Sequence, residues 1–464
     1  MKRDVGMSKK KYEIDMCSGS IVKKMLLFAL PLMFSGMLQL LFNAADIIVV
    51  GNFGSENSVA AVGATSSLIN LLTNVFIGLS VGTNVLVARF FGGNQTKELK
   101  ETVHTSVLLS LICGIFMAVA GVAVAPFILS KMNTPEGVLV LSSLYLRIYF
   151  LGMPATMVYN FGSAILRAVG DTKRPLYYLL LAGAVNFALN LVFVIVFRMD
   201  VAGVALATVI SQCLSAALVV RCLIKEQGGI HLNIKELSIR RDKFFKILQI
   251  GLPAGFQGTL FSLSNVFIQS SVNLFGEVVM EGNSAASSVE GFVYVAMNSM
   301  YQAAITFTSQ NIGAMKFERV NKIMITALGL VMTIGLVLGN LAVLFGRQLL
   351  SLYTDRPEAI EAGMVRMLII CTLYALCGMM DVMVGSLRGM GSSVVPMIVS
   401  LLGACVFRLI WLATIFQVEQ FHVIETIYIS YPVSWALTFA AHLITFAIVR
   451  YRRGKEWKAM LEET

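Results

Sequence analysis

Apolar segments long enough to cross a lipid bilayer recur along almost the whole chain, and this feature most restricts how it can fold. Of the 464 residues, 57% are hydrophobic and only 13% are charged, whereas about a quarter of the residues of a soluble domain carry charge. Backbone amides find no water inside a bilayer, so spanning segments must be helices or parts of a closed barrel. Segments of roughly 20 apolar residues indicate helices. The sequence therefore predicts an all-α polytopic membrane protein.

The chain divides into twelve expected membrane spans. They are residues 25–50, 58–88, 101–128, 136–165, 175–197, 203–220, 247–275, 283–308, 323–346, 358–386, 393–416 and 424–449. An even number of spans places both termini on the same side. Of the 36 Lys and Arg residues, 29 lie in the two tails and the loops on that side, and 4 lie in the opposite loops. Because positive charge accumulates on the cytoplasmic side, both termini are expected in the cytoplasm.

An internal repeat relates the two halves. Matching residues lie 221 or 222 positions apart: Pro31 and Pro253, Gly36 and Gly258, Asn43 and Asn265, Gly92 and Gly313, Gly170 and Gly391. Six spans per half give the halves the same orientation, as in transporters built from parallel repeats. We therefore expect two pseudo-symmetric six-helix bundles. The expected parts are a cytoplasmic N-tail (1–24), an N-lobe (25–220), a cytoplasmic linker (221–246), a C-lobe (247–449) and a cytoplasmic C-tail (450–464).

The first span carries a polar face. Gln39, Asn43 and Asp46 follow the spacing i, i+4, i+7 in an otherwise apolar segment, so they lie on one side of a helix. A carboxylate in the middle of a membrane helix costs on the order of 3 kcal/mol unless it faces a polar interior. Asp46 is therefore expected to look into the bundle.

Three further polar residues are expected, like Asp46, in the outer half of the membrane. Asn186 and Asn190 share a face of the fifth span, and Thr208 lies near the outer end of the sixth. Together with Asp46 they offer one carboxylate plus amide and hydroxyl oxygens, which suits a hard cation such as Na⁺. The alternative is a buried polar network that only joins helices.

The chain resembles the MATE family of multidrug and toxic compound extrusion transporters. The resemblance rests on LPLMFSGMLQLLFNAADIIVVGNFG, AVGATS, GLSVGTNVLVARFFG and ILRAVGDTKRP, which occur in order. It implies two six-helix lobes around a central cavity, and antiport of organic, often cationic, compounds against Na⁺ or H⁺. It also implies an N-lobe cation site at Asp46, Asn186, Asn190 and Thr208. Asn190 stands where relatives can carry a second acid, which leaves the ion open.

The second half does not copy this site. Ile268 replaces Asp46 in the repeat, and Arg408 takes the place of Asn186. The candidates there for substrate or proton binding are Asp381, which matches a common acid of the family, Glu290 and Arg408, and in the first half Gln39 and Asn43 join them. The alternative for Asp381 is a structural ion pair with Arg408 or Arg366.

The favoured function is a secondary active multidrug efflux antiporter, and the alternative is a lipid-linked oligosaccharide flippase of the same superfamily. A flippase would line its cavity with many basic residues, but only Arg147, Arg366 and Arg408 lie within spans. An enzyme would need paired acids, a His cluster or a nucleophile, and a passive channel would not need a two-lobe repeat. No nucleotide-binding motif occurs. We expect no enzyme activity, no cofactor, no nucleic-acid partner, a monomer, and a bacterial cytoplasmic membrane location.

The charge distribution generates a topology prediction. In right-side-out vesicles, protease added outside should spare the linker 221–246, which holds seven Lys and Arg residues. The same protease should cut the linker in inverted vesicles. Cleavage from the outside alone would reverse the topology.

Overall fold

The computed structural model describes residues 12–55, 57–131 and 136–462, and in these ranges all regular structure is helical. The first half comprises α1 (Ile21–Phe53), α2 (Ser58–Gly92), α3 (Thr96–Lys131), α4 (Glu136–Leu151), α5 (Met153–Ala168), α6 (Lys173–Asn190) with the π-helix η1 (Leu191–Val196), and α7 (Asp200–Lys225). The second half comprises α8 (Arg241–Val272), α9 (Glu277–Gly313), α10 (Arg319–Leu344), α11 (Gly346–Leu350), α12 (Pro357–Thr372), α13 (Ala375–Gly389), α14 (Val394–Ser400), the π-helix η4 (Leu401–Val406), α15 (Phe407–Ala413) and α16 (Ile424–Glu462). The all-α prediction is confirmed.

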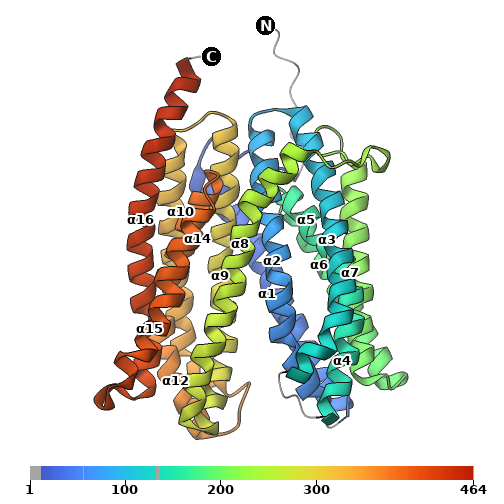
Figure 1. Ribbon diagram of the computed structural model, residues 1–464, viewed down its shortest axis with the longest axis vertical. Coiled ribbons are helices and arrows are strands. Elements are labelled where there is room, and N and C mark those ends of the chain that lie inside the picture. Colours follow the sequence, from blue (N-terminus) through green and yellow to red (C-terminus); the bar gives the residue numbers. More distant parts are fainter. Residues whose placement is uncertain (1–11, 56, 132–135, 463–464) are drawn as a thin grey trace. The chain divides into compact units, whose positions relative to one another are not determined.

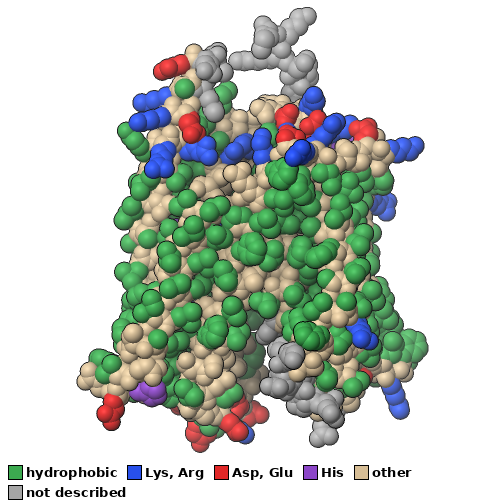
Figure 2. Space-filling view, viewed as in Figure 1, with side chains coloured by type: hydrophobic (Ala, Val, Ile, Leu, Met, Phe, Trp, Pro, Cys, Tyr) green, Lys and Arg blue, Asp and Glu red, His purple; other side chains and the backbone are tan. Residues whose placement is uncertain are grey.

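Each of the twelve expected spans corresponds to a helix or to a run of consecutive helices. Eight helices are long and apolar enough to cross a membrane, and two bent pairs raise this number to ten among the described residues. The two remaining spans fall on α8 and α9, which carry more polar side chains. In each unit, Figure 2 shows a lateral surface of mostly hydrophobic side chains, with Lys and Arg gathered towards one end of the helices.

Two expected spans are broken helices. The pair α4 and α5 bends by 48°, and the pair α12 and α13 bends by 46°. Pro154 explains the first break, because it lies in the first turn of α5, where its missing amide hydrogen is tolerated. The second break, around Tyr374, contains no proline or glycine. Only the first bend therefore had a sequence signal.

The repeat is visible in the backbone. The bends occur in corresponding spans, and α2 and α9 end at Gly92 and Gly313, 221 residues apart. The residues just after these helices, Asn94 and Met315, both adopt positive φ values, of 53° and 55°. Gly170 and Gly391, which follow α5 and α13, also have positive φ, at 94° and 89°. The two halves thus use the same turns at the same positions.

The chain forms two compact units that differ from the expected lobes. The first unit is Met1–Gly19 with Leu41–Gly251, and the second is Ser20–Leu40 with Leu252–Thr464. The first part of α1 thus belongs to the second unit, and the first part of α8 belongs to the first. In the second unit, α9 packs against α10, α12 and α13, and α16 packs against α12 and α13. Figure 1 shows α9, α10 and α16 as long helices that run in roughly the same direction.

Glycine residues allow the helices within each unit to pack closely. A Cβ atom on Gly36 of α1 would lie 2.1 Å from Val295 of α9, and a Cβ on Gly82 of α2 would lie 2.3 Å from the carbonyl oxygen of Ile247 in α8. The backbones approach closely because no side chain stands between them. Phe28 of α1 also packs edge-on against Phe307 of α9, with ring centroids 5.8 Å apart.

A buried polar cluster fixes the turn between α5 and α6. Asp171 accepts hydrogen bonds from the amides of Lys173 and Arg174, at 3.2 and 3.1 Å, and pairs with the Arg174 guanidinium. Arg174 also pairs with Glu226 at the end of α7. Burial raises the pKa of the Asp171 carboxyl, and the charge of Arg174 opposes this rise. The cluster ties three helices together at one end of the first unit.

Gly170, which precedes this cluster, generates a prediction. Its φ is positive, and a Cβ there would lie 2.6 Å from the carbonyl oxygen of Ile14. Gly170→Ala should therefore destabilise the protein by about 1–3 kcal/mol, seen as a lower midpoint of thermal unfolding in detergent. The control is Gly329→Ala in α10, where nothing lies within 4 Å. It should leave the midpoint unchanged or raise it slightly, and equal effects of the two changes would contradict the account.

Candidate functional site

The four residues predicted to form the N-lobe site are joined by hydrogen bonds in the first unit. Asn190 donates from Nδ2 to Oδ1 of Asp46 at 2.5 Å and to Oδ1 of Asn186 at 3.2 Å. Asn186 donates in turn to the hydroxyl of Thr208 at 3.4 Å. The chain runs from α1 through α6 to α7. The sequence spacing thus identified residues that do come together.

Local structure explains how these side chains meet. Asn186 and Asn190 lie one turn apart at the end of α6, and the π-helix η1 begins at the next residue, Leu191. Such wide turns are frequent at functional sites. Thr208 donates its hydroxyl hydrogen to the carbonyl of Val204 at 2.9 Å, which leaves the oxygen facing Asn186. The side-chain oxygen atoms of the network therefore come from three helices, α1, α6 and α7.

The surroundings of the network are apolar. Asn186 and Asn190 are buried, and Asp46 is half-buried. The stacked rings of Tyr145 and Tyr149 lie close enough to interact with the Asp46 charge. The Oδ1 atom of Asn190 is buried and has no hydrogen-bond partner among the described residues. An unpartnered buried oxygen next to a carboxylate is suited to a proton or a small cation.

The network can offer a cation Asp46 carboxylate oxygens, Asn amide oxygens and the Thr208 hydroxyl. This is a set of hard oxygen donors with a single negative charge, as expected for Na⁺ rather than for a divalent ion. Among the described residues no group of three or more His, Cys, Asp and Glu side chains could hold a metal. The residues present therefore fit a monovalent cation.

Gln39 and Asn43 are not part of this network. Both side chains are exposed on α1, and Gln39 falls in the second unit rather than the first. They share a helix face with Asp46, as the spacing predicted, but only Asp46 reaches α6. The helical periodicity predicted the polar face of α1, but it could not indicate which residue of that face joins the network.

In the second unit, the carboxylate that pairs with the buried Arg366 is Glu290 rather than Asp381. Arg366 donates from Nε and Nη2 to the two carboxylate oxygens of Glu290 at 2.8 and 2.6 Å, and from Nη1 to Asn283 at 2.8 Å. The pair joins α12 to α9, and both residues are buried. This two-bond geometry fills both oxygens of Glu290. The alternative that Asp381 forms an ion pair with Arg366 was therefore wrong.

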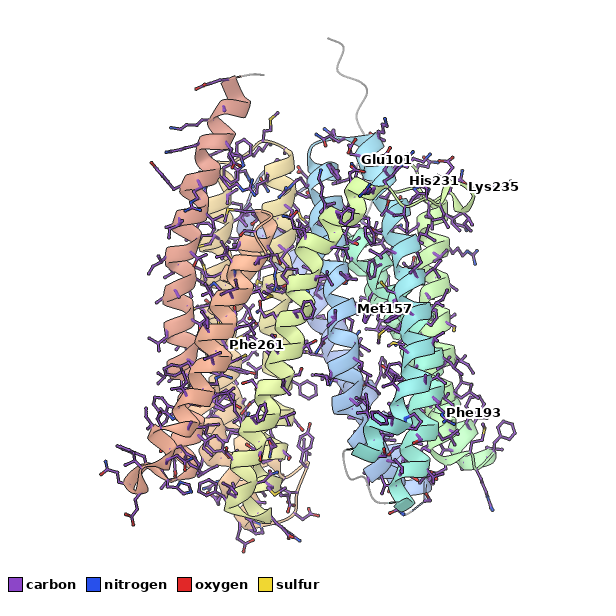
Figure 3. All side chains as sticks on the ribbon, viewed as in Figure 1. Glu101, Met157, Phe193, His231, Lys235 and Phe261 are labelled. Carbon is purple, nitrogen blue, oxygen red and sulfur yellow. The ribbon has the colours of Figure 1, made fainter. Side chains whose placement is uncertain are left out.

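Asp381 has a different environment. It accepts a hydrogen bond from the hydroxyl of Tyr294, and Arg388 supplies the opposite charge that acts on it. Arg388, one of the residues assigned to the cytoplasmic side, is buried and donates to Tyr301 and Gln257, the latter at 2.8 Å. These residues line a cavity of about 130 Å³ that also contacts Phe261, labelled midway along α8 in Figure 3.

Arg408 on α15 forms no ion pair among the described residues. Its Nε donates to the hydroxyl of Ser434 at 2.8 Å, and its guanidinium carbon lies 4.2 Å from the ring centroid of Tyr431. The alternative that Asp381 forms an ion pair with Arg408 was therefore also wrong. Arg147, the third arginine within the spans, is exposed on α4.

Several residues of this region were not found from the sequence. Tyr294, Tyr431 and Trp435 surround the charged groups of the second unit. Aromatic residues are common in membrane helices, and these three have no spacing that would separate them from packing residues. In the first unit, Asp200 binds Ser55 and Ser58 at 2.7 and 2.5 Å and so joins the start of α7 to α2.

Comparison with known proteins agrees with this architecture. The model of the MatE family matches residues 31–192 and again 253–413, which repeats the internal offset of 222 residues. The chain therefore belongs to the MatE family of membrane transporters. It is 27% identical over 431 residues to the probable multidrug resistance protein YoeA of Bacillus subtilis, covering 90% of this chain and 92% of the relative.

Two further comparisons extend over most of the chain. The probable multidrug resistance protein NorM of Thermotoga maritima is 24% identical over 397 residues, covering 84% of each chain. A solved structure described as the outward-facing conformation of a multidrug resistance MATE transporter has a TM-score of 0.89 at 20% identity, covering 97% of this chain and 100% of that one. At this identity the structural likeness establishes the fold alone.

The ion pair of the second unit generates a stability prediction. Glu290→Gln should destabilise the protein by about 3–5 kcal/mol, because it leaves the Arg366 charge buried and uncompensated. Adding Arg366→Gln should recover part of the loss. In the matched cycle, Asp381→Asn and Arg408→Gln should have additive effects, since they do not touch. Thermal unfolding in detergent measures both cycles, and additivity in the first or strong coupling in the second would contradict the assignment.

Proposed function

We propose that this protein is a secondary active efflux antiporter that exports organic, chiefly cationic, compounds in exchange for Na⁺ or H⁺ across a bacterial cytoplasmic membrane. The observation that carries the proposal is the hydrogen-bonded chain from Asp46 to Thr208, with the unpartnered Oδ1 of Asn190 beside it. Family membership and the names of the relatives support multidrug efflux.

The network provides a way to couple ion binding to a change of conformation. When Asp46 is charged and free, its oxygen accepts the hydrogen bond that Asn190 donates. A proton on Asp46, or a Na⁺ beside it, replaces that donor and favours the oxygen end of the Asn190 amide instead. Reversal of the amide also removes the donor from Asn186. Ion binding would therefore change the contacts between α1 and α6, and a ligand drives a conformational change only through such differential contacts.

α1 is well placed to carry this change further. Its second part, with Asp46, belongs to the first unit, and its first part packs against α9 of the second unit through Gly36 and Phe28. One continuous helix thus connects the ion site to both units. We propose that this helix shifts between two arrangements as the transporter alternates its access.

The flippase alternative has less support. A lipid pyrophosphate would need several free arginine or lysine side chains at membrane depth. Arg366 is neutralised by both oxygens of Glu290. Among the buried arginines within the expected spans this leaves Arg408, and one cation is few for a doubly charged headgroup.

Asp46→Asn provides the test. The amide keeps the size of the side chain and one oxygen, so the packing of α1 should survive, but the charge that binds the ion is lost. Uptake of a fluorescent cationic dye into inverted vesicles should fall to the level of empty vesicles, whether a pH gradient or a Na⁺ gradient is imposed. Equilibrium binding of the dye to purified protein should change little.

Two variants complete this experiment. Asn43→Ala on the exposed part of the same helix face should retain transport. Thr208→Ala should weaken transport driven by Na⁺ more than transport driven by H⁺, since its oxygen would bind the metal but not the proton. Wild-type rates in the Asp46→Asn variant would disprove the coupling role, and the gradient that drives the wild type identifies the ion.

A further inference from the structure

The second unit contains a cavity of about 290 Å³ that the N-lobe ion site does not use. It lies between α8, α9, α12 and α16, and its walls include Gln269, Glu290, Tyr294, Arg366, Tyr431 and Trp435. Its volume is near the lower end of the roughly 300–1,000 Å³ of small-molecule pockets. A ligand with one or two rings would fill it.

The charges around this cavity do not balance. Glu290 is neutralised by Arg366, and Asp381 has Tyr294 and Arg388 as partners. Arg408 remains. Its exposed fraction is 7%, and in the described part of the chain no carboxylate lies within 4.0 Å of it. The titratable groups that act most strongly on its charge are tyrosines and cysteines, which carry no charge near neutral pH. A lone buried cation in a membrane protein marks a functional site by default.

Hydrogen-bond donors are also in excess here. Arg408 uses only Nε, towards Ser434, among the described residues. The hydroxyls of Tyr374 and Tyr431, which line the cavity, likewise have no hydrogen-bond partner in the parts of the chain that are described. Both oxygens of Glu290 are already occupied by Arg366. The cavity thus offers free hydroxyl donors and lacks a free carboxylate that could hold an organic cation. Arg408 does not line the cavity, but its guanidinium lies over the ring of Tyr431, which does.

The aromatic side chains favour a planar ligand. The ring centroids of Tyr374 and Trp435 lie 5.4 Å apart, and those of Tyr431 and Trp435 lie 5.8 Å apart. The guanidiniums of Arg366 and Arg408 both lie over the Tyr431 ring, at 5.6 and 4.2 Å. Neighbouring cations strengthen the Tyr431 hydroxyl as a donor. Aromatic faces stack on ligand rings, and planar guanidiniums match carboxylates.

We propose that this cavity binds a small aromatic carboxylate, with the ring against Tyr374 and Trp435 and the carboxylate directed to the Tyr431 hydroxyl and the Arg408 charge. This assigns a second ligand class to a protein whose proposed exported compounds are cationic. It does not depend on ion coupling at Asp46, because the residues involved all belong to the second unit.

Tyr294 gives this site a connection to Asp381. It lines both the 290 Å³ cavity and the 130 Å³ cavity, and its hydroxyl donates to Asp381. A ligand that displaces the Tyr294 ring would remove the hydrogen bond that Asp381 receives. Occupation of the cavity is thereby linked to the buried acid of the second unit.

The test compares two probes with the same ring and opposite charge, indole-3-acetate and tryptamine. Binding of each radiolabelled probe to purified full-length protein is measured at equilibrium, without an ion gradient, so that a failure of coupling at Asp46 does not affect the result. We expect indole-3-acetate to bind about tenfold or more tightly than tryptamine. Arg408→Gln and Tyr431→Phe should each weaken indole-3-acetate binding about tenfold, as expected for loss of a hydrogen bond to a charged group.

The controls separate this site from general damage. Arg408→Lys keeps the charge and should retain more binding than Arg408→Gln. Arg347→Gln removes an exposed arginine that pairs with Glu361, and should have no effect. If Arg408→Gln does not fold, Tyr431→Phe decides the outcome, because it removes only a hydroxyl. Tighter binding of tryptamine, or unchanged indole-3-acetate affinity in the Tyr431→Phe variant, would overturn the proposal.

Discussion

The architecture of the first unit depends on one carboxylate in an apolar surrounding. Asp46 is the one charged residue in the apolar part of α1, so its charge is tolerated only if donors are supplied nearby. Asn190 supplies one, and it in turn is held by Asn186 and Thr208. The end of α6 and the middle of α7 must therefore remain beside α1. In the proposed function, neutralisation of Asp46 by a proton or a cation would weaken this contact.

In the second unit, the buried charged side chains are compensated in a different pattern. The repeat preserves the turns, the bends and the positive-φ positions, yet replaces the acid of α1 by Ile268 and introduces Arg408. Glu290 and Arg366 compensate each other, and Asp381 interacts with the phenol of Tyr294 and the charge of Arg388. Two units of one fold thus present a carboxylate network in one case and an excess of donors in the other. The two halves therefore share a backbone arrangement but not the polar residues placed on it.

Glycine positions control which helices pack together. Gly36 and Gly82 let α1 approach α9 and let α2 approach α8, so that the first part of each repeat's opening helix joins the other unit. A side chain at either position would collide with its neighbour. α1 is therefore a single helix whose two parts belong to different units. A movement of α1 at Asp46 could be passed along the helix to its first part.

The sequence by itself determined the helical class, the span positions and the repeat, because hydropathy and helical spacing are local properties. The family resemblance pointed to the candidate residues of the N-lobe network. Tertiary structure decided which polar groups meet. Asp381, Glu290 and Arg366 are separated in the chain. No spacing rule indicates that Arg366 forms its ion pair with Glu290, or that Asp381 accepts a hydrogen bond from Tyr294. The break near Tyr374 and the exchange of the first helical parts likewise arise from packing between helices, which the sequence of one helix does not contain. The donor-rich cavity has the same origin, since its walls come from four helices.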